Sequence, residues 1–192
     1  DITALVLAAF DSSGRLIFKP KFWLPAAVLD DPKHAEGRGP APYRTWVSQG
    51  HLTLTPGDWV DHNEIEAQIE SWIKEYSIRK VTFDQFAAAL GMASRINEKH
   101  ASADKPLAEV LHKKSATTTD PCKEIEARIK GGRSRFAHDG NPVMNWMASN
   151  VVVSRRRDET MIPIKESPMS LNKIDGIDAL VNAIAPAVVA IK

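Results

Sequence analysis

Two stretches near the start of the chain decide the fold class: TALVLAAF at residues 3–10 and RLIFKPKFWL at residues 15–24. Both are mainly apolar and have the length of a strand, and the turn-forming run DSSG at residues 11–14 separates them. Apolar runs joined by such a turn are typical of a β-hairpin. The sequence therefore predicts that the fold begins with an antiparallel pair of strands.

Beyond this hairpin, extended and helical segments alternate. The clearest helix covers residues 61–76, where apolar side chains recur at helical spacing on one face. The other expected elements are a loop at 25–43, strands at 51–55, 78–83, 107–111, 151–155 and 161–165, and helices at 85–97, 119–131, 142–149 and from residue 173, the last one kinked or ended by Pro186. This order predicts an α/β fold with a mixed β-sheet, antiparallel at first and partly parallel later.

Size and composition limit the class of protein. The chain has 192 residues, 43% of them hydrophobic and 26% charged, which fits a single globular domain at 1–192. The formal net charge is +1, so any binding of nucleic acid has to rest on local basic patches. The sequence has no apolar run near the ~20 residues that span a bilayer. The single cysteine, Cys122, excludes an internal disulfide and indicates a reducing compartment.

Acidic residues stand at two places where α/β proteins build sites. Asp84 ends the strand VTFD, and ligands of open α/β sheets bind at the carboxyl ends of strands. Its alternative role is to cap the following helix. Asp175 and Asp178 lie about 60° apart on the last expected helix, with Asn182 between them. One carboxylate at a strand end and another on a helix can together bind Mg²⁺ or Mn²⁺ for the two-metal hydrolysis of a phosphodiester. For Asp178 we favour the simpler role of a first-turn acid that interacts favourably with the helix dipole.

Basic residues cluster in two places that could contact a DNA backbone. Arg133 and Arg135 follow a pair of glycines at 131–132, and Arg155, Arg156 and Arg157 are consecutive. Such patches provide sequence-independent affinity for phosphates, although a solvated charged turn is the alternative for either cluster. The histidines show no metal-binding spacing, and no phosphate-binding loop or serine-nucleophile motif occurs in the sequence.

Taken together, the segments of the chain resemble the C-terminal nuclease half of the large terminase subunit of tailed bacteriophages. The segments are DITALVLAAF, FWLP, GHLTLTPGDWVD, VTFDQFAAA, DPCKEIEARIKGGR, HDGNPVMNWMASNVVV and KIDGIDALVNAIA. They follow the family's order over essentially the whole chain. The resemblance implies an RNase H-like mixed β-sheet flanked by helices. It also implies a metal-dependent endodeoxyribonuclease that cuts concatemeric viral DNA during genome packaging.

The resemblance also implies which residues act. Asp84 matches the acid that ends the family's central strand, and Asp175 matches the acid of its K-I-D motif, so both are expected to be catalytic ligands of two Mg²⁺ or Mn²⁺ ions. Asp178 falls where the family commonly has an apolar residue. The family's first metal-binding Asp lies in a strand several residues before the D-x-T-A-L segment, so we expect that strand upstream of residue 1. Asp1 is the nearest acid in this sequence and is a further candidate metal ligand. The family's ATPase half is likewise outside it.

The partners implied by the resemblance are double-stranded viral DNA and, in the full motor, the portal protein and the small terminase subunit. The expected location is the host cell cytoplasm, neither in a membrane nor in the mature virion. Two alternatives stay open. The chain could be a DNA- or portal-docking module without cleavage activity in isolation, or another RNase H-like nuclease of the resolvase or transposase type.

Overall fold

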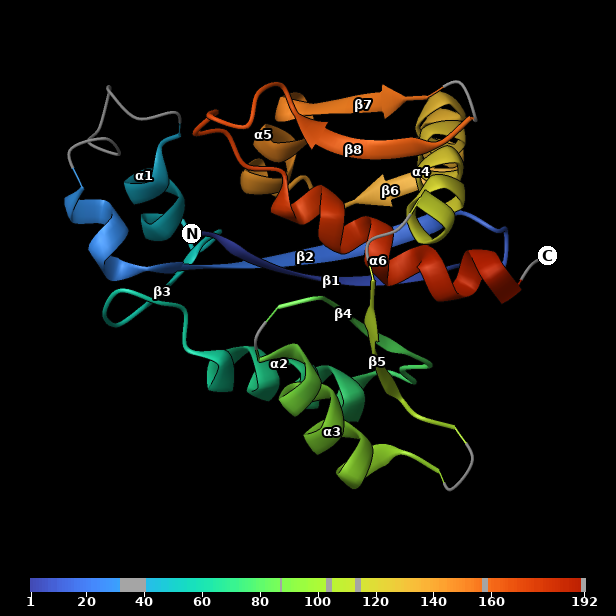
Figure 1. Ribbon diagram of the computed structural model, residues 1–192, viewed down its shortest axis with the longest axis horizontal. Helices are drawn as coiled ribbons and strands as arrows, with labels where there is room; N and C mark the ends of the chain where they lie inside the picture. Colours follow the sequence, from blue (N-terminus) through green and yellow to red (C-terminus); the bar gives the residue numbers. More distant parts are fainter. Residues whose placement is uncertain (32–40, 87, 103–104, 113–114, 157–158, 191–192) are drawn as a thin grey trace.

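The predicted hairpin lies at the centre of the molecule in the computed structural model, which describes residues 1–31, 41–86, 88–102, 105–112, 115–156 and 159–190 (Figure 1). Strand β1 (Thr3–Phe10) pairs antiparallel with β2 (Leu16–Pro25), from Thr3 opposite Trp23 to Phe10 opposite Leu16. The side chain of Asp11 accepts hydrogen bonds from the backbone N–H groups of Ser13 and Arg15, which closes the turn.

Three groups of paired strands make up the β structure. β2 also pairs in parallel with β3 (Thr53–Thr55) and with β6 (Phe136–His138). β4 (Val81–Asp84) and β5 (Ala108–Leu111) form a separate parallel pair, and β7 (Val151–Arg155) and β8 (Met161–Lys165) form an antiparallel one. The mixture of parallel and antiparallel pairing was predicted, whereas β6 was not.

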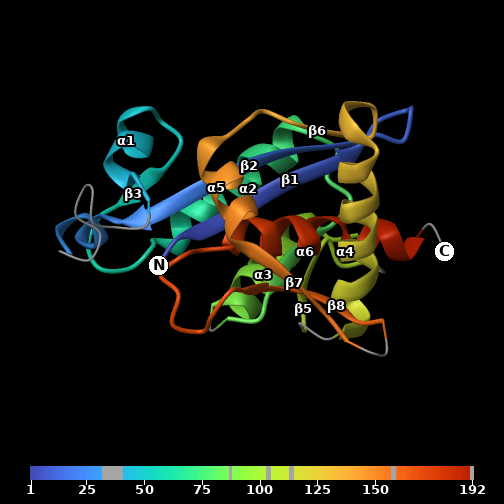
Figure 2. The ribbon, with the colours of Figure 1, turned by 90° about the horizontal axis from the view of Figure 1, so that it is seen from above.

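Helices cover both faces of the hairpin (Figures 1 and 2). They are α1 (Tyr43–Ser48), α2 (His62–Glu75), α3 (Ala89–His100), α4 (Ser115–Lys130), α5 (Pro142–Asn150) and α6 (Asp175–Ala190), with short 3-10 helices at Ala26–Asp30 and Gly132–Ser134. In the loop expected at 25–43, residues 32–40 lie outside the described part. In α2, the Asp61 side chain accepts from the backbone N–H of Asn63 and caps the helix as expected.

Two prolines lie inside helices. Helix α4 begins at Ser115 rather than near Pro121, so its predicted start is wrong. Of the two effects expected of Pro186, ending the last helix is excluded, because α6 continues to Ala190. Proline has no N–H, so the carbonyl of Asn182, four residues earlier, lacks its intrahelical partner. The hydroxyl of Thr82 donates to that carbonyl over 2.8 Å, which lets the helix continue.

Alternation along β1 separates two hydrophobic cores. Val6 belongs to a core that includes residues of α4, α5 and α6, whereas Leu5 packs against a core built from α2, α3 and β4. Because successive side chains of a strand point to opposite faces, α6 and α2 lie on opposite faces of β1. Among the described residues, no helix combines the length and apolar character needed to cross a membrane.

Candidate active site

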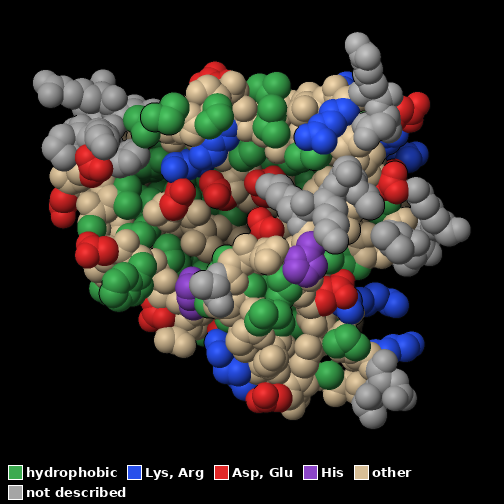
Figure 3. Space-filling model, viewed as in Figure 1, with side chains coloured by type: hydrophobic (Ala, Val, Ile, Leu, Met, Phe, Trp, Pro, Cys, Tyr) green, Lys and Arg blue, Asp and Glu red, His purple; other side chains and the backbone are tan. Residues whose placement is uncertain are grey.

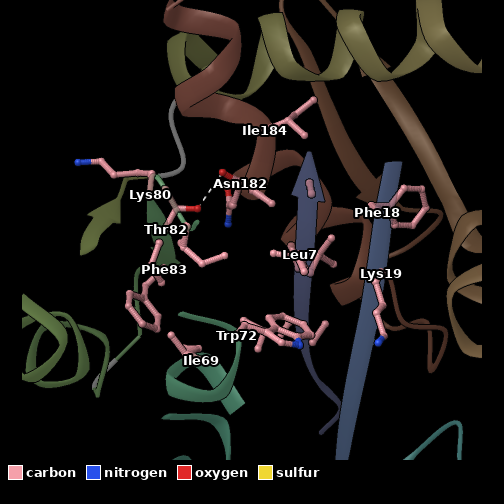
Figure 4. Close-up of a pocket in the computed structure, with 18 of the residues that line it drawn as sticks. Leu7, Phe18, Lys19, Ile69, Trp72, Lys80, Thr82, Phe83, Asn182 and Ile184 are labelled. Carbon is pink, nitrogen blue, oxygen red and sulfur yellow. Dashed lines mark hydrogen bonds between the residues drawn. The ribbon is translucent and has the colours of Figure 1, made fainter. Parts of the chain in front are cut away.

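A cleft of about 1520 Å³ lies between β1 and β4, with α6 along one face and α2 along the other. We call it the β1–β4 cleft. Figure 4 shows residues that line it: Leu7 on β1, Thr82 and Phe83 on β4, Asn182 and Ile184 on α6, and Ile69 and Trp72 on α2. The cleft walls are mainly apolar, and the acids Asp84, Asp175 and Asp178 also line it. The cleft thus brings together strand and helix carboxylates that are far apart in the sequence.

Asp84 is the last residue of β4 and faces the α6 side of the cleft. Thr82, two residues earlier, bonds to the α6 carbonyl of Asn182, and side chains two apart on a strand share a face. The Asp84 carboxylate accepts from the backbone N–H of Gln85 over 2.8 Å. Helix α3 begins only at Ala89 and has Ala88 as its N-cap, so Asp84 does not have the alternative role of capping that helix.

Asp175 is the first residue of α6, and its carboxylate is half-buried. Oxygen Oδ2 is shielded from solvent and has no hydrogen-bond partner among the described residues. Burial is the main cause that raises the pKa of Asp175; the charge of Asp178 raises this pKa further, and the charges of Lys173 and Lys165 lower it. The acid whose charge adds to this rise is thus Asp178, on the same helix, rather than Asp84.

The packing around Asp175 is tight. A Cβ atom added to the next residue, Gly176, would lie 2.7 Å from Met144 Sδ and 3.0 Å from Phe22 Cε1. Glycine therefore lets α6 begin close to β2 and α5, and a larger residue would require Met144 and Phe22 to shift. Tyr43 also lies near this helix start, since burial, together with the charge of Asp175, raises the pKa of Tyr43 to about 12.

Asp178 contributes more to the cleft than its sequence position suggested. It lies one turn after Asp175, lines the same cleft and is half-buried. The helix dipole was the role expected for Asp178, although the sequence already placed Asp175, Asp178 and Asn182 on one side of the helix. In the structure, all three residues line the cleft.

Asp1 does not line the cleft. Its side chain is 61% exposed and forms a 2.8 Å ion pair with Lys173. The charge of the same Lys173 lowers the pKa of Asp175, so Asp1 lies near that acid, but a lysine already neutralises the Asp1 carboxylate.

The donors in the cleft fit a hard divalent cation. They are carboxylates, and one of their oxygens, Asp175 Oδ2, is buried without a hydrogen-bond partner among the described residues. No cluster of three or more acidic, histidine or cysteine side chains with metal-binding geometry occurs in the part of the chain that the structure describes. Mg²⁺ commonly takes one or two carboxylates and completes its shell with water and substrate phosphate, so two carboxylates suffice to begin such a site.

The predicted DNA-binding arginines lie away from the cleft. Arg133, Arg135, Arg155 and Arg156 are exposed but do not line it, and Arg157 is outside the described residues. Arg155 pairs with Glu126 over 2.7 Å, so part of its charge is neutralised. The cations that line the cleft are others, which the sequence did not single out: Lys19, Arg79, Lys80 and Lys105.

Acidic side chains gather beside a hollow on one face of the molecule. Figure 3 shows acidic side chains around a hollow near the middle of this face, with basic side chains above and below. An acidic hollow repels DNA phosphates unless cations neutralise it. The electrostatics therefore agree with a site that needs divalent cations to accept a nucleic acid.

Comparison with known proteins identifies relatives over the whole chain. The family profile of the terminase large subunit, endonuclease domain, matches residues 1–190. Protein YmfN of Escherichia coli (strain K12) is 36% identical over 172 residues, which cover 88% of this chain and 35% of YmfN. The terminase large subunit of Enterobacteria phage HK97 is 28% identical over 194 residues, which cover 97% of this chain and 35% of that protein. The chain thus spans about a third of the length of these relatives.

A solved structure supports the fold. The crystal structure of the HK97 bacteriophage large terminase matches with a TM-score of 0.78 at 23% identity, over 97% of this chain and 36% of that chain. This likeness confirms the expected α/β fold with an RNase H-like mixed sheet flanked by helices. With a family match that extends from residue 1 to residue 190, the chain belongs to the terminase large subunit endonuclease domain family.

Proposed function

We propose that this chain is a metal-dependent DNA endonuclease domain, which cuts concatemeric viral DNA during genome packaging by a two-metal mechanism. The observation that carries the proposal is that Asp84 and Asp175 line one cleft, with Asp84 facing the helix that bears Asp175. Family membership supports a packaging-related nuclease, and the unpartnered oxygen of Asp175 supports a cation at this place.

Asp84 and Asp175 would hold the ions, and Asp178 is close enough to Asp175 to share in their binding through solvent. When bound, Mg²⁺ or Mn²⁺ polarises the scissile phosphate and provides an activated water for in-line attack. The protein's own contribution is to hold both carboxylates rigidly, through the β4–α6 hydrogen bond and the close packing at Gly176. Exposed cations would hold the DNA backbone: Lys19 and Arg79 at the cleft, and Arg133, Arg135, Arg155 and Arg156 outside it. Arg157, which is outside the described residues, would act with Arg155 and Arg156.

The longer protein would act in the host cell cytoplasm on double-stranded viral DNA, together with the portal protein and the small terminase subunit. An upstream strand would provide a further carboxylate, and Asp1 would act as a ligand only if Lys173 released it.

Nicking of supercoiled plasmid tests the proposal. We expect cutting with Mn²⁺ or Mg²⁺ and none with EDTA, and loss of cutting in Asp84→Asn and in Asp175→Asn. Asp30→Asn is the matched control, because Asp30 is exposed and distant from the cleft lining. DNA binding without cleavage by the longer protein would contradict the nuclease and favour the docking module. Preferential cutting of branched DNA would favour the resolvase type.

A further inference from the structure

We propose that an aromatic rim beside Asp84 stacks on an unpaired nucleobase, so that the preferred substrate of this domain is DNA whose duplex is locally open. The rim consists of His62, Phe86 and His112. The inference rests on the proposed function, which makes the ligand DNA. Its test measures binding without cleavage, so it can fail while the nuclease proposal stands, and the nicking assay can fail while the rim still binds bases.

The three rings of the rim meet where β4 and β5 end. The two strands pair in parallel up to Asp84, so the residues that follow them lie side by side. His112 Nδ1 accordingly donates a hydrogen bond to Gln85 Oε1 over 3.0 Å. Phe86 is the next residue along the chain, and its ring centroid lies 5.5 Å from that of His62, the first residue of α2. Aromatic side chains from three elements thus surround the end of the strand that bears the acid.

The ring of Phe86 is fixed by its neighbours and yet partly exposed. Its centroid lies 6.4 Å from that of Phe83, a buried residue of the core between α2, α3 and β4. The Phe83 ring and the His62 ring are both inclined to it, at 60° and 53°. Phe86 nevertheless remains 40% exposed. A ring with a fixed position and an accessible surface is what stacking on a nucleobase requires.

The rim lies within reach of the candidate metal site. Phe86 and His62 line the same cleft as Asp84 and Asp175. Two residues of chain span at most about 7 Å, so a phosphate bound by a cation at Asp84 lies close enough for its own nucleotide to reach Phe86. Figure 3 shows histidine and apolar side chains below the acidic hollow. Single exposed apolar side chains are ordinary on protein surfaces, but this one shares a cleft with the acids, which indicates a ligand.

Only DNA with an unpaired base can use such a rim at little cost. In a duplex each base is stacked on its neighbours, and the gain from one aromatic stack is comparable to the cost of removing a base from the duplex. A base that is already unpaired carries almost none of this cost. The exposed cations Arg79 and Lys105, which also line the cleft, attract the backbone of paired and open DNA alike. The difference in affinity between open and paired DNA therefore measures the rim.

Binding of the longer protein to two DNA probes tests this inference. Asp175→Asn is present throughout, with Mg²⁺, so that the probes stay intact. One probe is a duplex with a central unpaired bubble, and the other is the fully paired duplex of the same length. We expect the bubble to bind about tenfold more tightly or more, Phe86→Ala to abolish this preference, and Phe86→Trp to retain it. Trp59→Ala is the matched control, because Trp59 is 78% exposed and outside the cleft lining.

Phe86→Leu separates stacking from simple apolar contact. It keeps an apolar side chain without a ring, so it should lose the preference for the bubble as Phe86→Ala does. A parental preference in Phe86→Ala or in Phe86→Leu would overturn the inference. An equal loss of affinity for both probes would also overturn it, because the ring would then act on DNA of either kind.

A crosslinking measurement covers the case in which the Phe86 variants do not fold. Bromodeoxyuridine is placed either in the bubble or in a paired arm of the probe, which is bound to the protein with its rim intact. Irradiation couples the bromouracil base to a side chain in contact with it, and mass spectrometry identifies that residue. We expect coupling to His62, Phe86 or His112 from the bubble alone. Coupling from the bubble only to other segments, or equal coupling from the paired arm, would overturn the inference.

Discussion

The hydroxyl of Thr82 donates a 2.8 Å hydrogen bond to the backbone carbonyl of Asn182, and this bond links the two elements that bear the acids of the site. Thr82 lies two residues before Asp84 on β4, and Asn182 lies one turn after Asp178 on α6. The carbonyl is available because Pro186 has no N–H to donate to it. A proline in the helix and a threonine on the strand thus join the acid-bearing strand to the acid-bearing helix.

Loss of this link should impair both stability and cleavage. In Thr82→Val the carbonyl of Asn182 keeps its position but has no donor, which should lower the free energy of unfolding by about 1–3 kcal/mol. A shift of the two acids by even ~1 Å can cost about 100-fold in rate. Urea denaturation and plasmid nicking measure the two effects. Thr82→Ser retains the hydroxyl and should keep the stability and the nicking rate of the parent. If Thr82→Val also keeps both, the Thr82–Asn182 hydrogen bond does not hold the two acids in place.

Close packing at Gly176 leads to a prediction about the start of α6. Gly176→Ala introduces a methyl group 2.7 Å from Met144 Sδ, and overpacking of this kind typically costs about 1–3 kcal/mol. Because Asp175 is the preceding residue, we expect the variant to lose cleavage along with stability. Gly91→Ala, where the nearest atom is Arg95 Nη1 at 3.4 Å, is the matched control and should leave the nicking rate unchanged. Parental cleavage by Gly176→Ala would show that Asp175 need not be held at this position.

The raised pKa of Asp175 predicts how stability depends on pH without metal. Burial disfavours the charged carboxylate in the folded state, whereas the unfolded chain keeps an aspartate pKa of about 3.9. The contribution of Asp175 to stability is therefore greatest below that value and falls as the pH rises through the unfolded and then the folded pKa. In EDTA at pH 7, Asp175→Asn should melt at a higher temperature than the parent, and the difference should shrink towards pH 3. A lower melting temperature for Asp175→Asn at pH 7 would contradict this sign.

The exposed cations should govern DNA affinity rather than catalysis. Replacing Arg155, Arg156 and Arg157 with Ala should weaken binding and reduce the salt slope by about 0.9 per lost phosphate contact. The double variant Lys19→Ala/Arg79→Ala tests the two cations at the cleft in the same way. Lys74→Ala, on α2 but outside the cleft lining, is the control. Fluorescence anisotropy over a salt series measures the DNA affinity of all three variants. An unchanged dependence of affinity on salt in both test variants would rule out these DNA contacts.

A salt bridge between α2 and α3 allows a prediction that is independent of function. Glu66, which is only 8% exposed, accepts hydrogen bonds from Arg95, and these hold the pKa of Glu66 below its usual range. Its contribution to stability is present above the unfolded pKa and is lost as the pH falls through the lowered folded value. Glu66→Gln should therefore destabilise the protein at pH 7 by about 1–3 kcal/mol and less at pH 3. Glu64→Gln, in the first turn of the same helix, is the control, and equal effects of both variants in denaturant titrations would contradict the prediction.

Local sequence was sufficient for the hairpin, for α2 and for the β7–β8 pair. Their strand runs, turn residues and apolar periodicity all lie within a few residues of one another. Strand β6 could not be found this way, because Phe136–His138 becomes a strand only by pairing with Leu16–Phe18, more than a hundred residues earlier. The continuation of α6 through Pro186 also depends on a distant residue, Thr82. Long-range contacts decided these elements, and local propensity did not.

The sequence indicated only some of the residues that line the cleft. Asp84 and Asp175 stand at a strand end and on a helix border, and both line the cleft; their role as metal ligands stays a prediction. A first-turn acid such as Asp178 is common in helices, and only the packing of α6 shows which face of the helix meets the cleft. The cleft cations Lys19 and Arg79 are isolated in the sequence, whereas Arg133, Arg135, Arg155 and Arg156, from the two basic clusters, do not line the cleft.

Whether Asp84 and Asp175 share divalent ions is the central question, and a double-mutant cycle of Mn²⁺ affinity in the longer protein tests it most directly. The dissociation constant is measured by calorimetry for the parent, Asp84→Asn, Asp175→Asn and the double variant, with Asp30→Asn as control. If both carboxylates bind the same ions, each single variant should weaken affinity about tenfold or more, and the double variant should be little worse than either, with a coupling of about 0.5–3 kcal/mol. Additive effects, or parental affinity in either single variant, would contradict a shared metal site.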